Sequence, residues 1–310
     1  AEILVSRSER SSSGNLEQRA ANEGAKLLGV DSLNHIVCFD MAQLMGSERV
    51  GASIVFKNGR PSKKEYRTYK IKGDSADDLS MMRESVLRWI KRQNEWPDIL
   101  LLDEPLSALD PFLRRQMRAE LKQLQRKLNI TFVHVTHSQE EAMALADLVV
   151  VMRDGQIEQA DKPRTVFKEP VNEFVAEFLG DQNILIGQII SAKGKILTVE
   201  GPGNLRFPIS SANFSIGDTI KFALRSDGLA LGQIPKGSHR SKAKLIQTEY
   251  AGSNVQVKLR SDDGQEFNAI CGEDHFFSHN WHEGDDIYIS LDPAKIHPLS
   301  AKSATAHNLQ

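Results

Sequence analysis

The chain of 310 residues has little cysteine, no long apolar run and almost no excess charge. Its two cysteines, Cys38 and Cys271, lie far apart, so they suggest neither a metal-binding pair nor a disulfide framework, and they favour a reducing compartment. No apolar run approaches the ~20 residues that cross a bilayer, and the first residues lack the regions of a signal peptide. The net charge of -2 gives no reason to expect nucleic acid. We therefore expect a cytoplasmic protein of two or three domains.

A glycine-rich phosphate loop is also missing. The pattern G-x-x-x-x-G-K-[ST], in which backbone N–H groups and a lysine hold a triphosphate, occurs nowhere in the chain. Gly194-Lys195 follows its preceding glycine, Gly187, at the wrong spacing, and Gly24-Ala25-Lys26 lacks the second glycine and the hydroxyl residue. The sequence thus lacks the phosphate-binding loop with which many proteins bind ATP.

What the chain does have is an apolar run that ends in two acids. Residues 99–102 read Ile-Leu-Leu-Leu and lead into Asp103 and Glu104, after which Pro105 stops the strand. A carboxylate at Asp103 suits Mg²⁺ or its bound water, and a carboxylate at Glu104 suits a general base. A second apolar strand, residues 131–136, leads directly into His137. The pattern predicts a site at the edge of a sheet.

Residues 98–310 resemble the ATP-binding subunit of an ABC importer, of the kind that serves iron, polyamines or sugars. Asp103-Glu104 is similar to Walker B with its catalytic glutamate, residues 107–110 (Ser-Ala-Leu-Asp) to the D-loop, and His137 to the switch histidine. The β-rich tail resembles the regulatory TOBE barrel, including residues 224–227, Leu-Arg-Ser-Asp. Where the family has its glycine-rich signature loop, residues 79–83 read Leu-Ser-Met-Met-Arg, without the glycines that let backbone approach phosphate.

This resemblance implies a role for each matching residue. Glu104 and His137 would be catalytic, and Asp103, Ser107 and Asp110 would bind the cofactor, ATP with Mg²⁺. The implied partners are the membrane subunits of a transporter, with a homodimer left open. The altered loops imply that ATP binding is weak or absent.

Residues 1 to about 98 resemble the endonuclease region of the UvrC family of excision-repair proteins. The similar segments are residues 36–40 (Ile-Val-Cys-Phe-Asp), 50–56, 58–61 and 64–71. The resemblance implies an RNase H-like fold, DNA as the partner, and a Mg²⁺ or Mn²⁺ ion bound by Asp40 and Asp103. That family has a glycine-rich turn after its second acid, where this chain has Glu104-Pro105.

The spacing of apolar residues and turn signals predicts an α/β fold followed by an all-β barrel. We expect helices at residues 16–28, 77–94, 111–128 and 139–146, and strands at 35–41, 50–57, 65–71, 99–103, 130–136 and 148–152. The predicted order of the first sheet is the third, second and first strands, then 99–103, then 130–136, with right-handed crossovers. Beyond residue 180, short alternating runs between glycine and proline indicate an OB-like TOBE barrel.

The predicted domains are residues 1–98, 99–180 and 181–310. Three functional interpretations of the chain follow. The first is a remnant of an ABC-importer ATP-binding subunit in a recombined or engineered chimera, without ATPase activity. The second is an incomplete metal-dependent DNA endonuclease of the UvrC type. The third is a catalytically silent fold chimera. Whether the chain is natural or engineered stays open.

Overall fold

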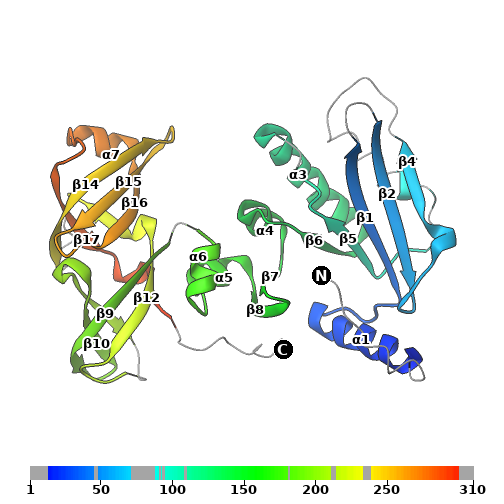
Figure 1. Ribbon diagram of the computed structural model, residues 1–310, viewed down its shortest axis with the longest axis horizontal. Helices are drawn as coiled ribbons and strands as arrows, with labels where there is room; N and C mark the ends of the chain where they lie inside the picture. Colours follow the sequence, from blue (N-terminus) through cyan, green and yellow to red (C-terminus); the bar gives the residue numbers. More distant parts are fainter. Residues whose placement is uncertain are drawn as a thin grey trace. The chain divides into compact units, whose positions relative to one another are not determined.

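The computed structural model describes residues 13–44, 48–70, 88–90, 92, 95–107, 110–180, 182–210, 214–232 and 239–299. The chain divides into two compact units (Figure 1), Ala1–Ala146 with Asn308–Gln310, and Asp147–His307. No helix among the described residues has the length and apolar character needed to cross a membrane.

The first unit is built on one mixed sheet. Its strands are β1 (His35–Leu44), β2 (Glu48–Lys57), β3 (Arg60–Pro61), β4 (Arg67–Lys70), β5 (Ile99–Asp103) and β6 (Thr131–Val135). The order is β3-β2-β1-β5-β6, and β4 also pairs with β2. β1 and β2 are antiparallel, whereas β5 is parallel to both β1 and β6. The predicted strand order is therefore confirmed, and it joins strands from the two resemblances in one sheet.

Side chains of β5 alternate between two cores, as expected for a strand buried on both faces. Leu100 and Leu102 are fully buried in a core with Met117 and Leu121 of α3 (Pro111–Leu128). Ile99, on the opposite face, belongs to a second core.

Helix α1 (Ser13–Leu28) covers that second face through Ala25, with Leu101 and Val133 packed nearby. Gly29 ends the helix with a positive φ of 64°. The helix predicted at residues 77–94 lies mostly outside the described residues. Within that range, the described residues 88–90 are helical. A further helix of this unit is α4 (Gln139–Leu145).

The second unit begins with the hairpin of β7 (Val149–Arg153) and β8 (Gln156–Asp161). Asp154 and Gly155 both have positive φ, 51° and 77°, which is the conformation of a tight two-residue hairpin turn. Two short helices follow, α5 (Pro163–Lys168) and α6 (Glu173–Phe178).

Two antiparallel sheets then enclose one core. The first has the order β11-β10-β9-β12-β18 and the second the order β13-β17-β14-β15-β16. Their bounds are β9 Gln182–Lys193, β10 Ile196–Glu200, β11 Arg206–Ser210, β12 Thr219–Arg225, β13 Leu229–Leu231, β14 Arg240–Tyr250, β15 Asn254–Ser261, β16 Glu266–Gly272, β17 Asp286–Leu291 and β18 Ile296–Pro298. A short helix, α7 (Glu273–Ser278), follows β16.

The shared core explains why the two sheets form one body. Leu185 of β9 and Phe222 of β12 are fully buried with Leu245 of β14 and Phe267 of β16. The β-rich, barrel-like tail predicted from the sequence is thus confirmed.

The hairpin and its two helices pack on these sheets, which is why the compact unit begins at Asp147. Ala176 of α6 is buried against Ala223 of β12. On the same elements, Lys221 Nζ lies 2.6 Å from the Glu173 carboxylate. The domain boundaries predicted at residues 98 and 180 separate segments that resemble different families. These boundaries stay predictions.

Candidate functional site

Strands β1, β5 and β6 lie side by side and run in the same direction, and β1 continues past its pairing with β5 to Leu44. Phe39 is paired with Leu102, and Asp103 with Val135. Asp40 and Glu104 come next along β1 and after β5, and His137 follows β6 by two residues. Asp40, Asp103, Glu104 and His137 therefore lie on neighbouring parallel strands or on the turns that follow them. Their shared role as a site stays a prediction.

Glu104 turns the chain sharply after β5. Its φ is +39°, in the left-handed region that favours glycine. Its backbone N–H donates to the carbonyl of Val135 at 2.9 Å, and its own carbonyl accepts from the Ser107 N–H at 3.2 Å and the Ser107 hydroxyl at 3.0 Å. The turn is therefore fixed by hydrogen bonds to β6 and to the following loop.

The Glu104 side chain reaches His137. Nδ1 of His137 lies 3.2 Å from Oε1 of Glu104, and the two side chains are 71% and 49% exposed. At such exposure the pair adds about 0–1 kcal/mol to stability. It brings a carboxylate and an imidazole together where both can reach a molecule in solvent, and this is an arrangement suited to moving a proton.

Besides burial, the carboxylates of Asp103 and Asp40 both raise the pKa of the Cys38 thiol. The pKa of the Cys38 thiol is raised, chiefly because the side chain is partly buried, and then because the carboxylates of Asp103 and Asp40 repel the thiolate. Both carboxylates are exposed at the sheet edge. The two acids predicted to share a metal are thus close enough to act on the same neighbour.

A metal would find few ligands here. Among the described residues, no group of three or more histidine, cysteine, aspartate or glutamate side chains is arranged to hold one. Two carboxylates are a small ligand set compared with the six or more oxygens that hard cations prefer. The metal-binding roles of Asp40 and Asp103 stay predictions.

Two residues predicted to bind the cofactor have local structural partners. One carboxylate oxygen of Asp110 accepts from the N–H groups of Phe112 and Leu113, at 2.9 and 3.1 Å, and caps α3. The Ser107 hydroxyl donates to the Glu104 carbonyl. Their cofactor-binding roles stay predictions. The cap itself was readable as an aspartate directly before Pro111 at the first position of the helix.

The sequence reasoning overlooked a residue that positions His137. Glu141 of α4 is only 4% exposed and accepts from the Thr136 hydroxyl at 2.8 Å. Ser138 caps α4 by accepting from the Glu141 N–H. These contacts lie on both sides of His137 and fix the turn that presents it. The signal was the spacing Ser138-x-x-Glu141, which is typical of a capping box.

The residues present do not fit a firmly bound ATP. The whole sequence has no glycine-rich loop that offers backbone N–H groups to phosphate. The Glu104 N–H at the sheet edge is already bonded to Val135. The edge therefore has acid–base groups without a cradle for the triphosphate.

Comparison with known proteins gives two family matches. Residues 25–174 match the family model of the UvrC RNase H endonuclease domain. Residues 209–299 match that of the TOBE domain. The first match covers the whole sheet of the first unit, including the strands after residue 98.

The chain also resembles curated import proteins. It is 45% identical over 177 residues to the spermidine/putrescine import ATP-binding protein PotA of Oleidesulfovibrio alaskensis, covering 55% of this chain and 46% of that protein. It is 41% identical over 212 residues to PotA of Nitratidesulfovibrio vulgaris, covering 66% of this chain and 54% of that protein. The chain thus spans about half the length of these relatives.

One solved structure has a loose similarity. The cytoplasmic molybdate-binding protein ModG, with molybdate bound, superposes with a TM-score of 0.34 at 11% identity, covering 37% of this chain and 94% of that protein.

Proposed function

We propose that this chain is a recombined polypeptide that keeps the catalytic edge of an ABC-importer ATP-binding subunit but does not hydrolyse ATP. The observation that carries the proposal is the contact of His137 with Glu104, 3.2 Å, in a chain that has no phosphate-binding loop. Natural and engineered origins of the recombination are both compatible with this proposal.

The physical reason is that positioning dominates phosphoryl transfer. Most of the catalytic effect comes from holding the phosphates and stabilising their charge, and a general base alone contributes little without them. Glu104 would accept a proton from water, and His137 would orient that carboxylate. Asp103 would hold hydrated Mg²⁺. The sequence has no phosphate-loop motif, and no described residue at this edge would keep the γ-phosphate within reach of these groups.

The test is ATP turnover by phosphate release, together with calorimetric titration of ATP, both in Mg²⁺. We expect no turnover above the protein-free blank and no saturable binding at millimolar ATP. Glu140→Gln is the matched control for Glu104→Gln, because Glu140 is an exposed acid of α4 near the same edge. Turnover that disappears in Glu104→Gln but persists in Glu140→Gln would overturn the proposal.

A second candidate function is metal-dependent DNA cleavage. It is supported by the parallel pairing of β1 with β5, which brings Asp40 and Asp103 to one edge, and by the UvrC match. Two metals about 4 Å apart usually clamp the attacking and leaving oxygens in such reactions. Plasmid nicking in Mn²⁺ that is lost in Asp40→Asn and kept in the exposed-acid control Glu140→Gln would establish it.

Partners and location follow from the same proposal. The chain would dock on transporter membrane subunits at the cytoplasmic face if its importer segment keeps that role, and on DNA if the nuclease segment does. A homodimer is an additional proposal, which light scattering tests directly. The absence of both activities, with cooperative unfolding of the first unit, would favour the catalytically silent chimera.

A further inference from the structure

The first unit contains a cavity on the face of the sheet from which Val37, Val55 and Tyr69 project into the core. Its volume is about 480 Å³, within the range of small-molecule sites. His35 lines it at the start of β1, and Tyr69 lines it level with Met41, because both of these residues pair with Gly51. Side chains alternate between the two faces along a strand, so Asp40, which directly follows the buried Phe39, lies on the opposite face. None of the residues that line the cavity comes from β5 or β6, and the cavity is therefore separate from Glu104 and His137.

Aromatic and aliphatic side chains form its inner walls. Val37, Val55, Tyr69 and Trp89 line the cavity, and each is at most 4% exposed. Phe39 packs against both aromatic residues, with ring centroids 6.2 Å from Tyr69 and 5.6 Å from Trp89. The walls are thus held in place by the core, which means that a planar ring would enter a preformed slot.

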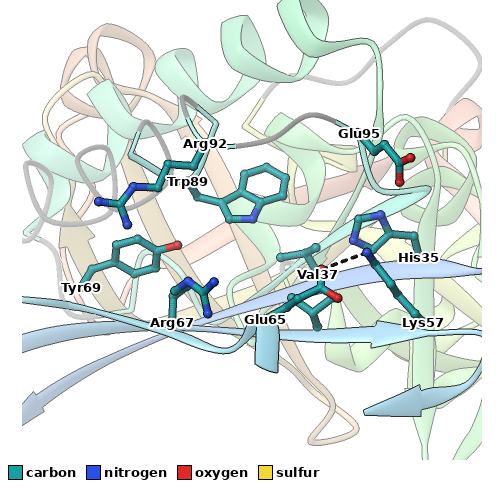
Figure 2. Close-up of a pocket in the computed structure, with 10 residues that line it drawn as sticks. His35, Val37, Lys57, Glu65, Arg67, Tyr69, Trp89, Arg92 and Glu95 are labelled. Carbon is teal, nitrogen blue, oxygen red and sulfur yellow. Dashed lines mark ion pairs between the residues drawn. The ribbon is translucent and has the colours of Figure 1, made fainter. Parts of the chain in front are cut away.

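The two ends of the cavity differ in chemistry (Figure 2). Figure 2 shows the guanidinium groups of Arg67 and Arg92 on the side of Tyr69. On the other side it shows His35, Lys57 and Glu95, and the Trp89 indole lies between the two groups. One end therefore offers delocalised cations, and the other offers an imidazole and a carboxylate.

Part of this charge is already matched within the protein. Lys57 Nζ lies 2.9 Å from Glu65, and that carboxylate also accepts from the Ser62 hydroxyl at 2.7 Å. One terminal nitrogen of Arg67 donates to two backbone carbonyls. The other guanidinium nitrogens of Arg67, and all three side-chain nitrogens of Arg92, have no hydrogen-bond or ion-pair partner in the described part of the chain.

We propose that this cavity binds a small aromatic phosphate ester. The ring would pack against Trp89 and Tyr69. The phosphate would accept hydrogen bonds from the guanidinium groups of Arg67 and Arg92. Arginine matches the oxygens of phosphate with paired N–H groups, and such charge-assisted bonds are about twice as strong as neutral ones. A hydrogen-bond donor on the far side of the ring would meet Glu95.

The far end also has a neutral group. Burial, and then the charge of Lys57, lowers the pKa of His35 below its ordinary value, so the imidazole is uncharged at neutral pH. It can accept or donate one hydrogen bond there without repelling a polar substituent. The cavity thus matches a molecule with an anionic end, a flat middle and a hydrogen-bond donor at the other end.

The test is calorimetric titration of the full chain with phenyl phosphate, 4-aminophenyl phosphate and inorganic phosphate. We expect saturable binding of both esters, tighter for the amino compound. Inorganic phosphate should bind at least about tenfold more weakly, because it lacks the ring. Equal binding of inorganic phosphate and the esters, or no saturable binding of any ester, would overturn the proposal.

Variants of the cavity's edge locate the binding. Arg92→Gln should weaken phenyl phosphate binding by about tenfold, the usual cost of one charge-assisted contact. Arg115→Gln, on the exposed face of α3, is the matched control and should bind like the parent chain. Near-ultraviolet circular dichroism shows whether each variant keeps its fold. Folded Arg92→Gln protein that binds with unchanged affinity would exclude the cavity as the site.

Discussion

The side chain of Glu104 contacts His137, but its backbone adopts an unfavourable conformation. At φ +39° a residue with a Cβ atom is disfavoured by about 1 kcal/mol, whereas glycine accepts this conformation readily. In the UvrC resemblance a glycine-rich turn follows the second metal-binding acid, and the sharp turn seen here explains the physical use of glycine at that point. The chain instead has the side chain that contacts His137.

The strain makes a testable comparison between two variants. Glu104→Gly and Glu104→Ala both remove the contact with His137, so their difference reports the backbone alone. We expect the glycine variant to be more stable than the alanine variant by about 1 kcal/mol in urea unfolding. Equal stabilities would show that the turn is relaxed in solution.

His134 gives the first unit a dependence on pH. The side chain is largely buried on β6, its Nδ1 has no hydrogen-bond partner among the described residues, and burial lowers its pKa from 6.5 to about 4. Between these two pH values the unfolded chain binds a proton that the folded chain does not, so the stability of the fold increases with pH. Below pH 4 both states are protonated, and above 6.5 neither is.

Replacing this histidine should therefore flatten the profile. We expect the free energy of unfolding of the parent chain to fall between pH 6.5 and pH 4, by about 1.4 kcal/mol per unit of pKa difference. His134→Phe should lose most of this dependence on pH. His35 has a lowered pKa and contributes in the same direction, so a small dependence remains.

The control is Gln116→Leu, at an exposed position of α3, which should keep the parent profile because it removes no titratable group. An unchanged profile in His134→Phe would mean that His134 is solvated in solution.

At the scale of elements, a buried asparagine joins the two sheets of the second unit. Asn183 of β9 is 5% exposed and donates to the carbonyls of Leu224 and Asn268, at 3.2 and 2.9 Å. Its own oxygen accepts from the N–H of Asn268 at 2.6 Å. It therefore ties β9 to the neighbouring β12 and to β16 of the other sheet.

Removing this link should destabilise the unit. Asn183→Leu leaves a donor and two acceptors without partners, at about 1–3 kcal/mol for each buried group that water cannot reach. The expected result is a clear loss of thermal stability by circular dichroism. Gln188→Leu, at an exposed position of the same strand, is the control and should change little. Equal melting temperatures would place water at the Asn183 site.

Much of this element structure is predictable from the sequence. The Asp154-Gly155 turn, the apolar strand that ends at Asp103 and the helix after Pro111 depend on local signals, and each forms where expected. Two histidines show contacts of a kind that local signals do not predict. His275 lies in the short helix α7, and its Nε2 is 2.8 Å from the carbonyl oxygen of Leu231, 44 positions away in the sequence. Nδ1 of His279 is 2.8 Å from the carbonyl oxygen of His275.

The cavity beside Trp89 was not predicted, because its lining comes from β1, β2, β4 and the segment around residues 89–95. Only the folded sheet brings Arg67 near Arg92. The edge with Asp40, Asp103 and His137 was predictable for the opposite reason. Parallel strands deliver their carboxyl ends to the same side, so strand order alone places these residues.

At the scale of the whole molecule, the compact units do not coincide with the two resemblances. β5, which follows residue 98, is hydrogen-bonded on one side to β1 and on the other to β6. A fragment of residues 1–98 would therefore lack the central strand of its own sheet. Residues 147–307, in contrast, contain both strands of every pair that they form.

This difference predicts the behaviour of fragments. We expect residues 147–307 expressed alone to unfold cooperatively on heating and to give dispersed amide signals in NMR spectra. Residues 1–98 should show neither property, whereas residues 1–146 should show both. A folded 1–98 fragment would contradict the assignment of β5 as an integral strand of the first unit.

The pairing of β1 with β5 also has a consequence for the time course of folding. Ile36 meets Ile99 across 63 positions of chain, whereas the hairpins of the second unit pair residues only a few positions apart. Closing a long loop costs entropy before any contact repays it, so non-local pairings slow the rate of folding. During synthesis on the ribosome, β1 and β2 leave the exit tunnel before β5, so the edge of β1 that pairs with β5 is at first unpaired. During that interval this edge can pair with other chains, and a chaperone that binds nascent chains would have its largest effect then.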